Sequence, residues 1–368
     1  MVGGAHVSGL ALLSRYVGRR VSLAIAMALL VIVGLDVVAE VIDELGDVRN
    51  DYQFRQVMEY VGLTLPSQAY DYLPFSALIG CLVGLGILAG NSEIVVMRAA
   101  GISLWRIMAM VVKPILWFVL LGMLVGEFAT PYLDQLADGR RQLQRTGMQS
   151  AADNGGVWSV EGREYIHINA VFPGGVVFGV TRYQFDQQRQ LQSASFSSRA
   201  TFDRARRHWV EENVAITRFV GDGEQSRTVA EKQVTRIWPS ELTPALLQQN
   251  VLAPENLSIQ SLYGYIRFLG QQQRASGAYE LALWAKVLQP LTVIGLVILA
   301  VAFVFGPLRE STMGLRIFVG VVTGIGFRIL QDMLEPSSLV FGFPPLVAVA
   351  LPIVLCFVIG ARLLRRAA

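Results

Sequence analysis

Six long apolar stretches constrain this chain more than any other feature of its sequence. They cover residues 21–42, 57–89, 104–128, 281–305, 315–334 and 344–364. A helix rises ~1.5 Å per residue, so about 20 apolar residues cross the ~30 Å core of a bilayer. Only 16% of the residues are charged, and the mean hydropathy is +0.47, whereas soluble proteins carry ~25% charged residues. The sequence therefore predicts an α-helical membrane protein with six transmembrane helices.

The chain becomes polar between the third and fourth apolar stretches. Strand-like pieces occupy residues 164–169, 175–183, 193–202, 209–219 and 228–238, with turn signals such as Phe185-Asp-Gln-Gln188 and Gly221-Asp-Gly223 between them. Short strands at roughly regular spacing are typical of an antiparallel sandwich or jelly roll. We therefore predict transmembrane helices 1–3 in residues 1–133, an inserted β-jelly-roll domain in residues 134–256, and a linker helix followed by transmembrane helices 4–6 in residues 257–368.

A short polar segment, residues 91–103, separates the second and third apolar stretches. Asn91 or Ser92 can cap a helix here, Glu93 suits the positive end of the helix dipole, and Gly101 can end the helix in the left-handed conformation. Nine helical residues reach only ~14 Å, far less than the bilayer core. We therefore predict a small helix outside the membrane, held between two spans.

One face of this helix is predicted to carry Ile94, Met97 and Gly101, which follow i, i+3, i+7 spacing, with Glu93 and Arg98 beside it. An exposed helix with an acid, an arginine and a small apolar face can dock on another protein as a rigid lever. The alternative is a surface helix that merely joins two spans.

Basic residues predict the orientation, because cytoplasmic segments of membrane proteins are enriched in lysine and arginine. If both termini are cytoplasmic, the inside segments carry Arg15, Arg19, Arg20, Arg98, Arg106, Arg309, Arg316, Arg362, Arg365 and Arg366. The short outside loops then carry Asp43, Glu44, Asp47, Asp51, Asp332 and Glu335, with Arg49, Arg55 and Arg328 as exceptions. This places the short helix in the cytoplasm and the β domain outside it.

Glycines four residues apart recur in the apolar stretches, at Gly80/Gly84, Gly86/Gly90, Gly122/Gly126 and Gly320/Gly324. Such spacing lets helices approach closely in lipid. We expect these positions to be helix contacts.

Catalytic chemistry is poorly represented in the sequence. No lysine follows a glycine, so there is no phosphate-binding GxxxxGK[ST] loop, and there is no HExxH or Gly-x-Ser-x-Gly element. The three histidines lack the spacing of zinc ligands, and both cysteines lie in apolar runs. The small net charge of +3 gives no reason to expect a nucleic-acid partner. We predict a non-enzymatic chain with no metal and no cofactor of its own.

Four segments resemble signature stretches of a known family. They are Ser92-Glu-Ile-Val-Val-Met-Arg-Ala-Ala-Gly101, Trp284-Ala-Lys-Val-Leu-Gln-Pro290, Phe305-Gly-Pro-Leu-Arg-Glu-Ser-Thr-Met-Gly-Leu-Arg316 and Phe341-Gly-Phe-Pro-Pro345. The chain resembles the lipopolysaccharide-export ABC transporter permeases of the LptF/LptG (YjgP/YjgQ) family over nearly its whole length. The stretches at 284–290 and 341–345 are more similar to the LptG branch.

The resemblance implies a permease subunit of an ATP-driven exporter in the bacterial inner membrane, with three-plus-three spans around a periplasmic jelly roll. It implies a second permease of LptF type, two LptB-type ATPase subunits that hold ATP and Mg²⁺, and a membrane-anchored LptC-type partner. Such an assembly extracts lipopolysaccharide and passes it to a periplasmic bridge.

The resemblance also implies site residues. The coupling helix that docks on the ATPase corresponds to Glu93, Ile94, Val95, Met97, Arg98, Ala99, Ala100 and Gly101. Arg140 and Arg141 match a basic element that faces the substrate's phosphates, which guanidinium groups bind in a bidentate way. The chain departs from the family in carrying Glu40, Gly46 and Asp47 where lysines are expected near the outer end of the first span.

Two larger substrate surfaces follow from these interpretations. Phe178, Phe196 and Phe202 are candidates for an apolar groove in the β domain. The substrate's acyl tails need a cavity shared with a second permease, with apolar walls from residues 29–38 and 318–330.

Two other functions are alternatives. A secondary transporter would bind its substrate at mid-membrane on broken helices with inverted repeats, and we see no convincing repeat. A non-transporting scaffold of an envelope complex would show no coupled ATPase activity.

Overall fold

A computed structural model describes residues 3–46, 48, 52–146, 157–172, 174–220, 227–244, 246–247, 254–271, 275–306 and 311–367. Of the features discussed above, Asp47, Arg49, Asp51, Arg309 and the turn at 221–223 lie outside these residues. The chain divides into two compact units. The helical unit comprises Met1–Val38, Leu65–Phe128 and Ser258–Ala368, and the sheet unit comprises Ala39–Thr64 and Ala129–Leu257.

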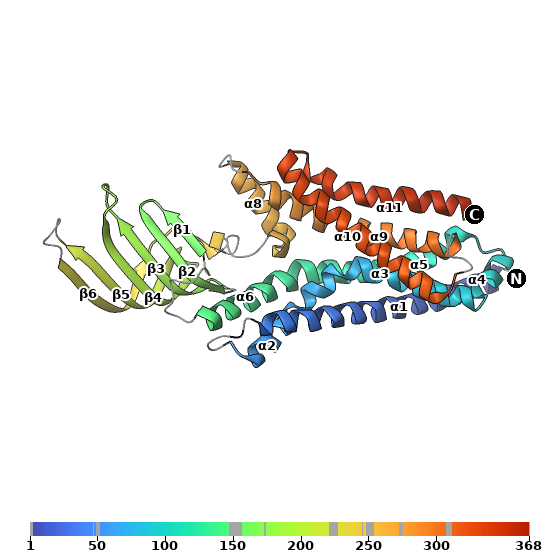
Figure 1. Cartoon of the computed structure of the whole chain (residues 1–368), viewed down its shortest axis with the longest axis horizontal. Helices are drawn as coiled ribbons and strands as arrows, with labels where there is room; N and C mark the ends of the chain where they lie inside the picture. Colours follow the sequence, from blue (N-terminus) through green and yellow to red (C-terminus); the bar gives the residue numbers. More distant parts are fainter. Residues whose placement is uncertain are drawn as a thin grey trace. The chain divides into compact units, whose positions relative to one another are not determined.

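Helices make up most of the chain (Figure 1). They are α1 (Gly3–Leu45), α2 (Phe54–Asp71), α3 (Leu73–Gly90), α4 (Glu93–Ala99), α5 (Leu104–Leu124), a π-helical turn (Val125–Ala129), α6 (Thr130–Thr146), α8 (Ile259–Gln271), α9 (Gly277–Phe305), α10 (Met313–Phe341) and α11 (Pro345–Ala367). Segments long and apolar enough to cross a membrane are Ala11–Leu45, Leu73–Gly90, Leu104–Gln144, Gly277–Phe305, Met313–Phe341 and Pro345–Arg366. The fold is that of a helical membrane protein with an inserted antiparallel β domain.

The predicted second span, 57–89, is in fact two helices. Pro66 lies inside α2 without ending it, whereas Pro74 lies in the first turn of α3, where its missing N–H leaves no hydrogen bond unmade. The hydroxyl of Tyr72, at the junction, donates to Asp36 of α1 at 2.7 Å. Burial and then this hydrogen bond raise the pKa of Tyr72 to about 12, so the phenol remains a neutral donor. Only α3 is apolar enough to span.

The glycine pairs lie where helices meet, as the sequence predicted. A Cβ on Gly80 would lie 2.4 Å from the Ile25 Cα of α1, and one on Gly320 would lie 2.6 Å from the Leu82 side chain of α3. Glycines 84, 86, 122, 126 and 324 are similarly close to other elements, and only Gly90 has nothing within 4 Å. Close backbone approach is therefore what these residues provide.

The centre of the helical unit is formed by α3 and α9. Leu78, Leu82 and Leu85 of α3 and Leu296 of α9 are fully buried. By contrast, α1 and α10 keep many large apolar side chains exposed, including Leu30, Leu35 and Phe318. Exposed apolar side chains are favourable on these faces if they contact lipid or another membrane helix instead of water.

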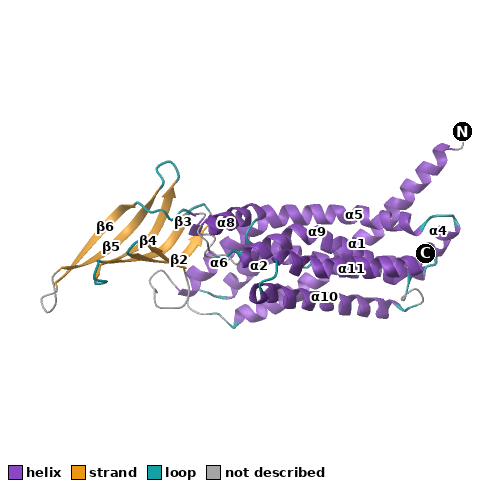
Figure 2. Ribbon diagram, turned by 90° about the horizontal axis from the view of Figure 1, so that it is seen from above, coloured by secondary structure: helices purple, strands orange, loops and turns teal. Residues whose placement is uncertain are grey.

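The described strands form one six-stranded antiparallel sheet in the order β1 to β6 (Figure 1). Figure 2 shows the sheet in orange. They are β1 (Val157–Glu161), β2 (Glu164–Phe172), β3 (Val176–Phe185), β4 (Leu191–Asp203), β5 (His208–Val220) and β6 (Arg227–Trp238). The five predicted strands are confirmed. The two-sheet jelly roll is not, because each described strand pairs with its sequence neighbour in a simple meander. The prediction missed β1, which joins β2 through Gly162-Arg163, a two-residue hairpin with φ 62° at the glycine.

The buried face of the sheet changes partway along the strands. Val177 and Val180 of β3 are both buried although they are an odd number of residues apart, and in a regular strand such residues face opposite sides. Gly179 between them has φ 64°, and Asn213 of β5 has φ 53° at the matching place. At these residues the backbone is left-handed, so the side chains that follow face the opposite side of the sheet from the one that regular alternation would give.

In the same unit, α6 packs on β2, and a Cβ on Gly139 would lie 3.0 Å from the Val171 carbonyl oxygen.

Candidate functional site

The predicted short helix is present as α4. It spans Glu93–Ala99, and Gly101 has φ 84°, as expected for a left-handed residue after the helix. Ser92 is not the predicted cap, because it has φ 59° and its side chain makes no capping hydrogen bond. The side-chain amide of Asn91, the other candidate, donates to the Glu93 carboxylate at 3.5 Å. The Glu93 carboxylate also accepts a hydrogen bond from the hydroxyl of Tyr16 in α1 at 3.2 Å.

The faces of α4 are the reverse of those expected. Ile94 and Met97 are each only 6% exposed and belong to the core of the helical unit. Val95 and Val96 are 56% and 66% exposed. The i, i+3 pair is apolar because it holds α4 against its own chain, so the prediction that it forms the docking face is wrong. The exposed face carries the two valines together with Arg98, Ala99 and Ala100.

A hollow of about 590 Å³ adjoins α4. It is lined by Ala89, Ile94, Val95, Arg98, Ala99, Val304 and Phe305. The end of α9 thus forms one wall, and α4 offers a valine and an arginine to whatever enters.

A buried arginine ties α10 to α3 behind this helix. Arg316 is 4% exposed, and its guanidinium donates to the Gly86 carbonyl of α3 at 2.7 Å. The chain runs from Gly86 through the end of α3 directly into α4. Arg316 therefore links α10 to the helix that leads into α4.

The two arginines predicted to contact phosphates lie on α6, and each pairs with a glutamate of the sheet unit. Arg140 pairs with Glu59, and Arg141 pairs with Glu44. The first pair is open to solvent, with 43% and 41% of the side chains exposed, whereas the Glu44 side chain is only 7% exposed. Both arginines are therefore already paired with carboxylates, with which any phosphate ligand would have to compete.

Two tyrosines complete the surroundings of Arg141. The Tyr52 hydroxyl donates to Glu44 at 2.8 Å, and the guanidinium of Arg141 lies 4.9 Å from the ring centroid of Tyr60. Burial, and for Tyr52 also the hydrogen bond to Glu44, holds the pKa of both phenols above the usual range. Both remain neutral at any physiological pH, so the charge balance here is set by the arginines, the glutamates and Asp138, which interacts electrostatically with Arg141.

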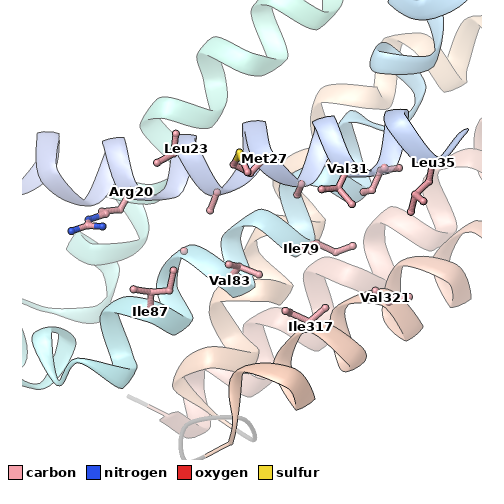
Figure 3. Close-up of a pocket in the computed structure, with 14 residues that line it drawn as sticks. Arg20, Leu23, Met27, Val31, Leu35, Ile79, Val83, Ile87, Ile317 and Val321 are labelled. Carbon is pink, nitrogen blue, oxygen red and sulfur yellow. The ribbon is translucent and has the colours of Figure 1, made fainter. Parts of the chain in front are cut away.

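An apolar groove of about 490 Å³ runs between α1, α3 and α10 (Figure 3). Its lining residues are Arg20, Leu23, Ala24, Met27, Ala28, Val31, Ile32, Leu35, Ile79, Val83, Gly84, Ile87, Ile317 and Val321. The predicted walls, 29–38 and 318–330, contribute Val31, Ile32, Leu35 and Val321. The groove also extends toward the N-terminal part of α1 and includes α3, which the prediction omitted.

The structure does not bring together the three phenylalanines predicted to line a groove in the β domain. Phe202 contacts Trp209, with ring centroids 5.1 Å apart, and packs on the buried apolar cluster of the sheet unit. Phe178 lies against Phe172 instead, and Phe196 lies between buried Ser195 and Ser197, so it points to the other side. Simple alternation could not show this, because the buried face changes at Gly179 and Asn213.

A polar network occupies the buried side of the same sheet. Glu211, which is fully buried, accepts hydrogen bonds from Arg182 at 3.1 Å and Arg236 at 2.7 Å. Ser197 donates to the same carboxylate at 3.3 Å. Arg182 also pairs with Glu164 at 2.6 Å, so two arginines meet two carboxylates and the charges of this network balance, as buried ion pairs require.

The family model for the lipopolysaccharide export system permease LptF/LptG matches residues 15–366. The chain belongs to the LptF/LptG family. It is 32% identical to the lipopolysaccharide export system permease protein LptG of Escherichia coli strain K12 over 355 residues, which cover 96% of this chain and 98% of that protein. It is 31% identical to the protein of the same name from Haemophilus influenzae, over the same shares.

Membership in the LptF/LptG family makes this chain a membrane-spanning permease of lipopolysaccharide transport. The matched range contains α4, the apolar groove, the two arginines and the whole sheet. The partners of these residues were not predicted. Tyr16 and Glu44 lie far in sequence from Glu93 and Arg141, and no local pattern marks such contacts.

Proposed function

We propose that this chain is the permease subunit of an ATP-driven exporter, which extracts lipopolysaccharide from the inner membrane and passes it to a periplasmic bridge toward the outer membrane. ATP and Mg²⁺ bind to two LptB-type ATPase subunits. An LptF-type permease and a membrane-anchored LptC-type protein complete the assembly. The named relatives, which are lipopolysaccharide export permeases, support this proposal, as does a sequence without any nucleotide-binding loop.

The proposed topology has three spans on each side of a periplasmic β domain, with both termini in the cytoplasm. The arginine distribution supports it, since Arg15, Arg19 and Arg20 precede the apolar part of α1 and Arg365 and Arg366 end α11. In this orientation α4 is cytoplasmic and can reach an ATPase.

The observation that carries the proposal is the construction of α4. Its inner face is fixed in the core by Ile94 and Met97, and its outer face exposes Val95, Val96 and Arg98. A helix held on one side and free on the other can transmit force as a rigid body. Its connection through α3 and Arg316 to α10, a wall of the groove, gives that force a route to the substrate.

The substrate contacts divide into apolar and charged ones. Acyl tails lie against exposed side chains of α1 and α10, where burial contributes ~25 cal/mol per Å². Arg140 and Arg141 contact the phosphates, and such charges mainly fix depth and orientation. Glu44 and Glu59 hold these arginines in the absence of substrate.

Val96→Asp tests the proposal. The change should reduce co-purification of the ATPase at least tenfold, because burying a valine contributes ~2 kcal/mol and an aspartate at the contact adds a desolvation cost. Val160→Asp in β1 is the matched control, since Val160 is 58% exposed and lies in the other unit. Met97→Asp is unsuitable because Met97 is buried. Normal ATPase binding and lipopolysaccharide-stimulated hydrolysis in Val96→Asp would contradict the assignment and favour a scaffold.

A further inference from the structure

The apolar groove has a charged end. Among the described residues that line it, Arg20 alone carries a charge, and it lies at the end of the row formed by Leu23, Met27, Val31 and Leu35 (Figure 3). A volume of about 490 Å³ falls within the ~300–1,000 Å³ typical of small-molecule sites. One cation at the end of an apolar channel complements an amphipathic anion.

The part of the groove from Arg20 to Val31 matches lipid dimensions. Arg20 and Val31 are separated by eleven residues, or ~16 Å along the helix, close to half of a ~30 Å bilayer core. In the proposed topology Arg20 is at the cytoplasmic surface, so Leu23 to Val31 lie at the depth of the inner-leaflet acyl chains. In the proposed function lipopolysaccharide is passed to the periplasmic side, opposite Arg20, so a different lipid meets this end of the groove.

We propose that this end of the groove binds an anionic phospholipid of the cytoplasmic leaflet. Its headgroup phosphate lies on the planar guanidinium of Arg20, whose parallel N–H groups can bind two phosphate oxygens at once. One acyl chain lies along Leu23, Met27 and Val31 of α1, against Val83 of α3. The site rests on the proposed topology of the exporter. It lies on the cytoplasmic side of the α1 wall assigned to lipopolysaccharide, residues 29–38, and shares Val31 with that wall.

The proposed headgroup position is connected to α4. The Arg20 guanidinium lies 5.4 Å from the ring centroid of Tyr16, and the Tyr16 hydroxyl donates to Glu93. Arg20 and Tyr16 are one helical turn apart on α1. A lipid that fixes Arg20 therefore also fixes the tyrosine that holds the first residue of α4, so the bound lipid orders the docking helix.

Photo-crosslinking with defined lipids tests the site. The full chain is reconstituted in phosphatidylcholine vesicles containing a trace of photoactivatable phosphatidylglycerol or photoactivatable phosphatidylcholine, and the crosslinked peptides are identified by mass spectrometry. We expect phosphatidylglycerol to be captured on α1 and α3 peptides in preference to phosphatidylcholine. Arg20→Gln should lower this capture about fivefold, the factor that corresponds to ~1 kcal/mol for one arginine near an anionic lipid.

Two variants control for nonspecific charge and for charge geometry. Arg19→Gln removes an exposed neighbouring arginine that does not line the groove, and Arg20→Lys keeps the charge. Both should retain most of the capture. Equal capture of the two lipids, or unchanged capture in Arg20→Gln, would overturn the proposal.

The same measurement on the chain purified with its co-purifying subunits distinguishes other occupants. Loss of capture there would show that a partner helix fills the groove, which also overturns the proposal. The assay needs neither ATP nor lipopolysaccharide. A negative result therefore does not contradict the exporter assignment, and a failure of the Val96→Asp test does not change the interpretation of the lipid-binding result.

Discussion

At the scale of single residues, the arginines on α6 show how a binding group can be held in place by its own chain. Arg141 pairs with a nearly buried glutamate, which Tyr52 also contacts, and it stacks on Tyr60. Arg140 pairs with Glu59 in solvent. Removing Arg141 leaves a buried carboxylate without its cation, which costs ~1–3 kcal/mol or more. Arg141 is therefore a structural residue as well as a candidate ligand. Substitutions that affect Arg140 test phosphate binding with less effect on stability.

Glu59→Gln should strengthen lipopolysaccharide binding. The substitution frees Arg140 for a phosphate, and an exposed ion pair is worth ~0.2–1 kcal/mol, so the affinity should rise by up to about fivefold. Titration of the purified chain with fluorescent lipopolysaccharide measures the change. Glu255→Gln, at another exposed glutamate of the same unit, should have no effect. An affinity that falls in Glu59→Gln would make Glu59 a contact of the substrate and not a competitor for Arg140.

At the scale of elements, local sequence predicts what forms but not what it touches. The apolar stretches, the five strands, the glycine contacts and Gly101 after α4 follow from periodicity, turn chemistry and backbone sterics. The orientation of α4 does not. Ile94 and Met97 form an apolar face whether that face meets a partner or the protein's own core, and only the tertiary structure decides.

The sheet shows the same limit. Its strands were predictable, but their buried side depends on left-handed backbone at Gly179 and Asn213. Asparagine adopts that conformation without being obliged to. The pairing of Arg141 with Glu44 joins α6 to the end of α1, and a single sequence contains no signal for it.

Gly80→Ala should destabilise the protein, because the new methyl would lie 2.4 Å from the Ile25 Cα and would force α1 away from α3. Overpacking of this kind costs ~1–3 kcal/mol. Gly90→Ala is the matched control in the same helix, since nothing lies within 4 Å of its Cβ position. Alanine should be neutral or slightly stabilising there. Thermal unfolding of the detergent-solubilised chain gives the comparison, and equal unfolding temperatures would mean that α1 does not depend on this contact.

At the scale of the whole molecule, the proposed export path must continue from the helical unit to the β domain, and the sheet offers two unlike sides. On one side lie the buried apolar residues Val177, Trp209 and Trp238, with Phe202 partly exposed at their margin. Phe178 and Phe196 lie on the other side. An amphipathic lipid that uses this domain as a passage should meet the apolar side at Phe202, because that residue is the partly exposed margin of the cluster and can bury a tail against it.

We therefore expect a photo-crosslinking amino acid at position 202 to capture lipopolysaccharide in cells with an active exporter, and capture should depend on ATP hydrolysis. The same amino acid at positions 178 and 196 is the matched control, since each replaces a partly buried phenylalanine of the same sheet. Those positions should capture little lipid, because their side chains face away from the apolar cluster. Capture at 178 or 196 with none at 202 would place the passage on the opposite side. Capture at none of the three, in a transporter that still exports, would make the domain a docking module whose apolar side serves only its own core.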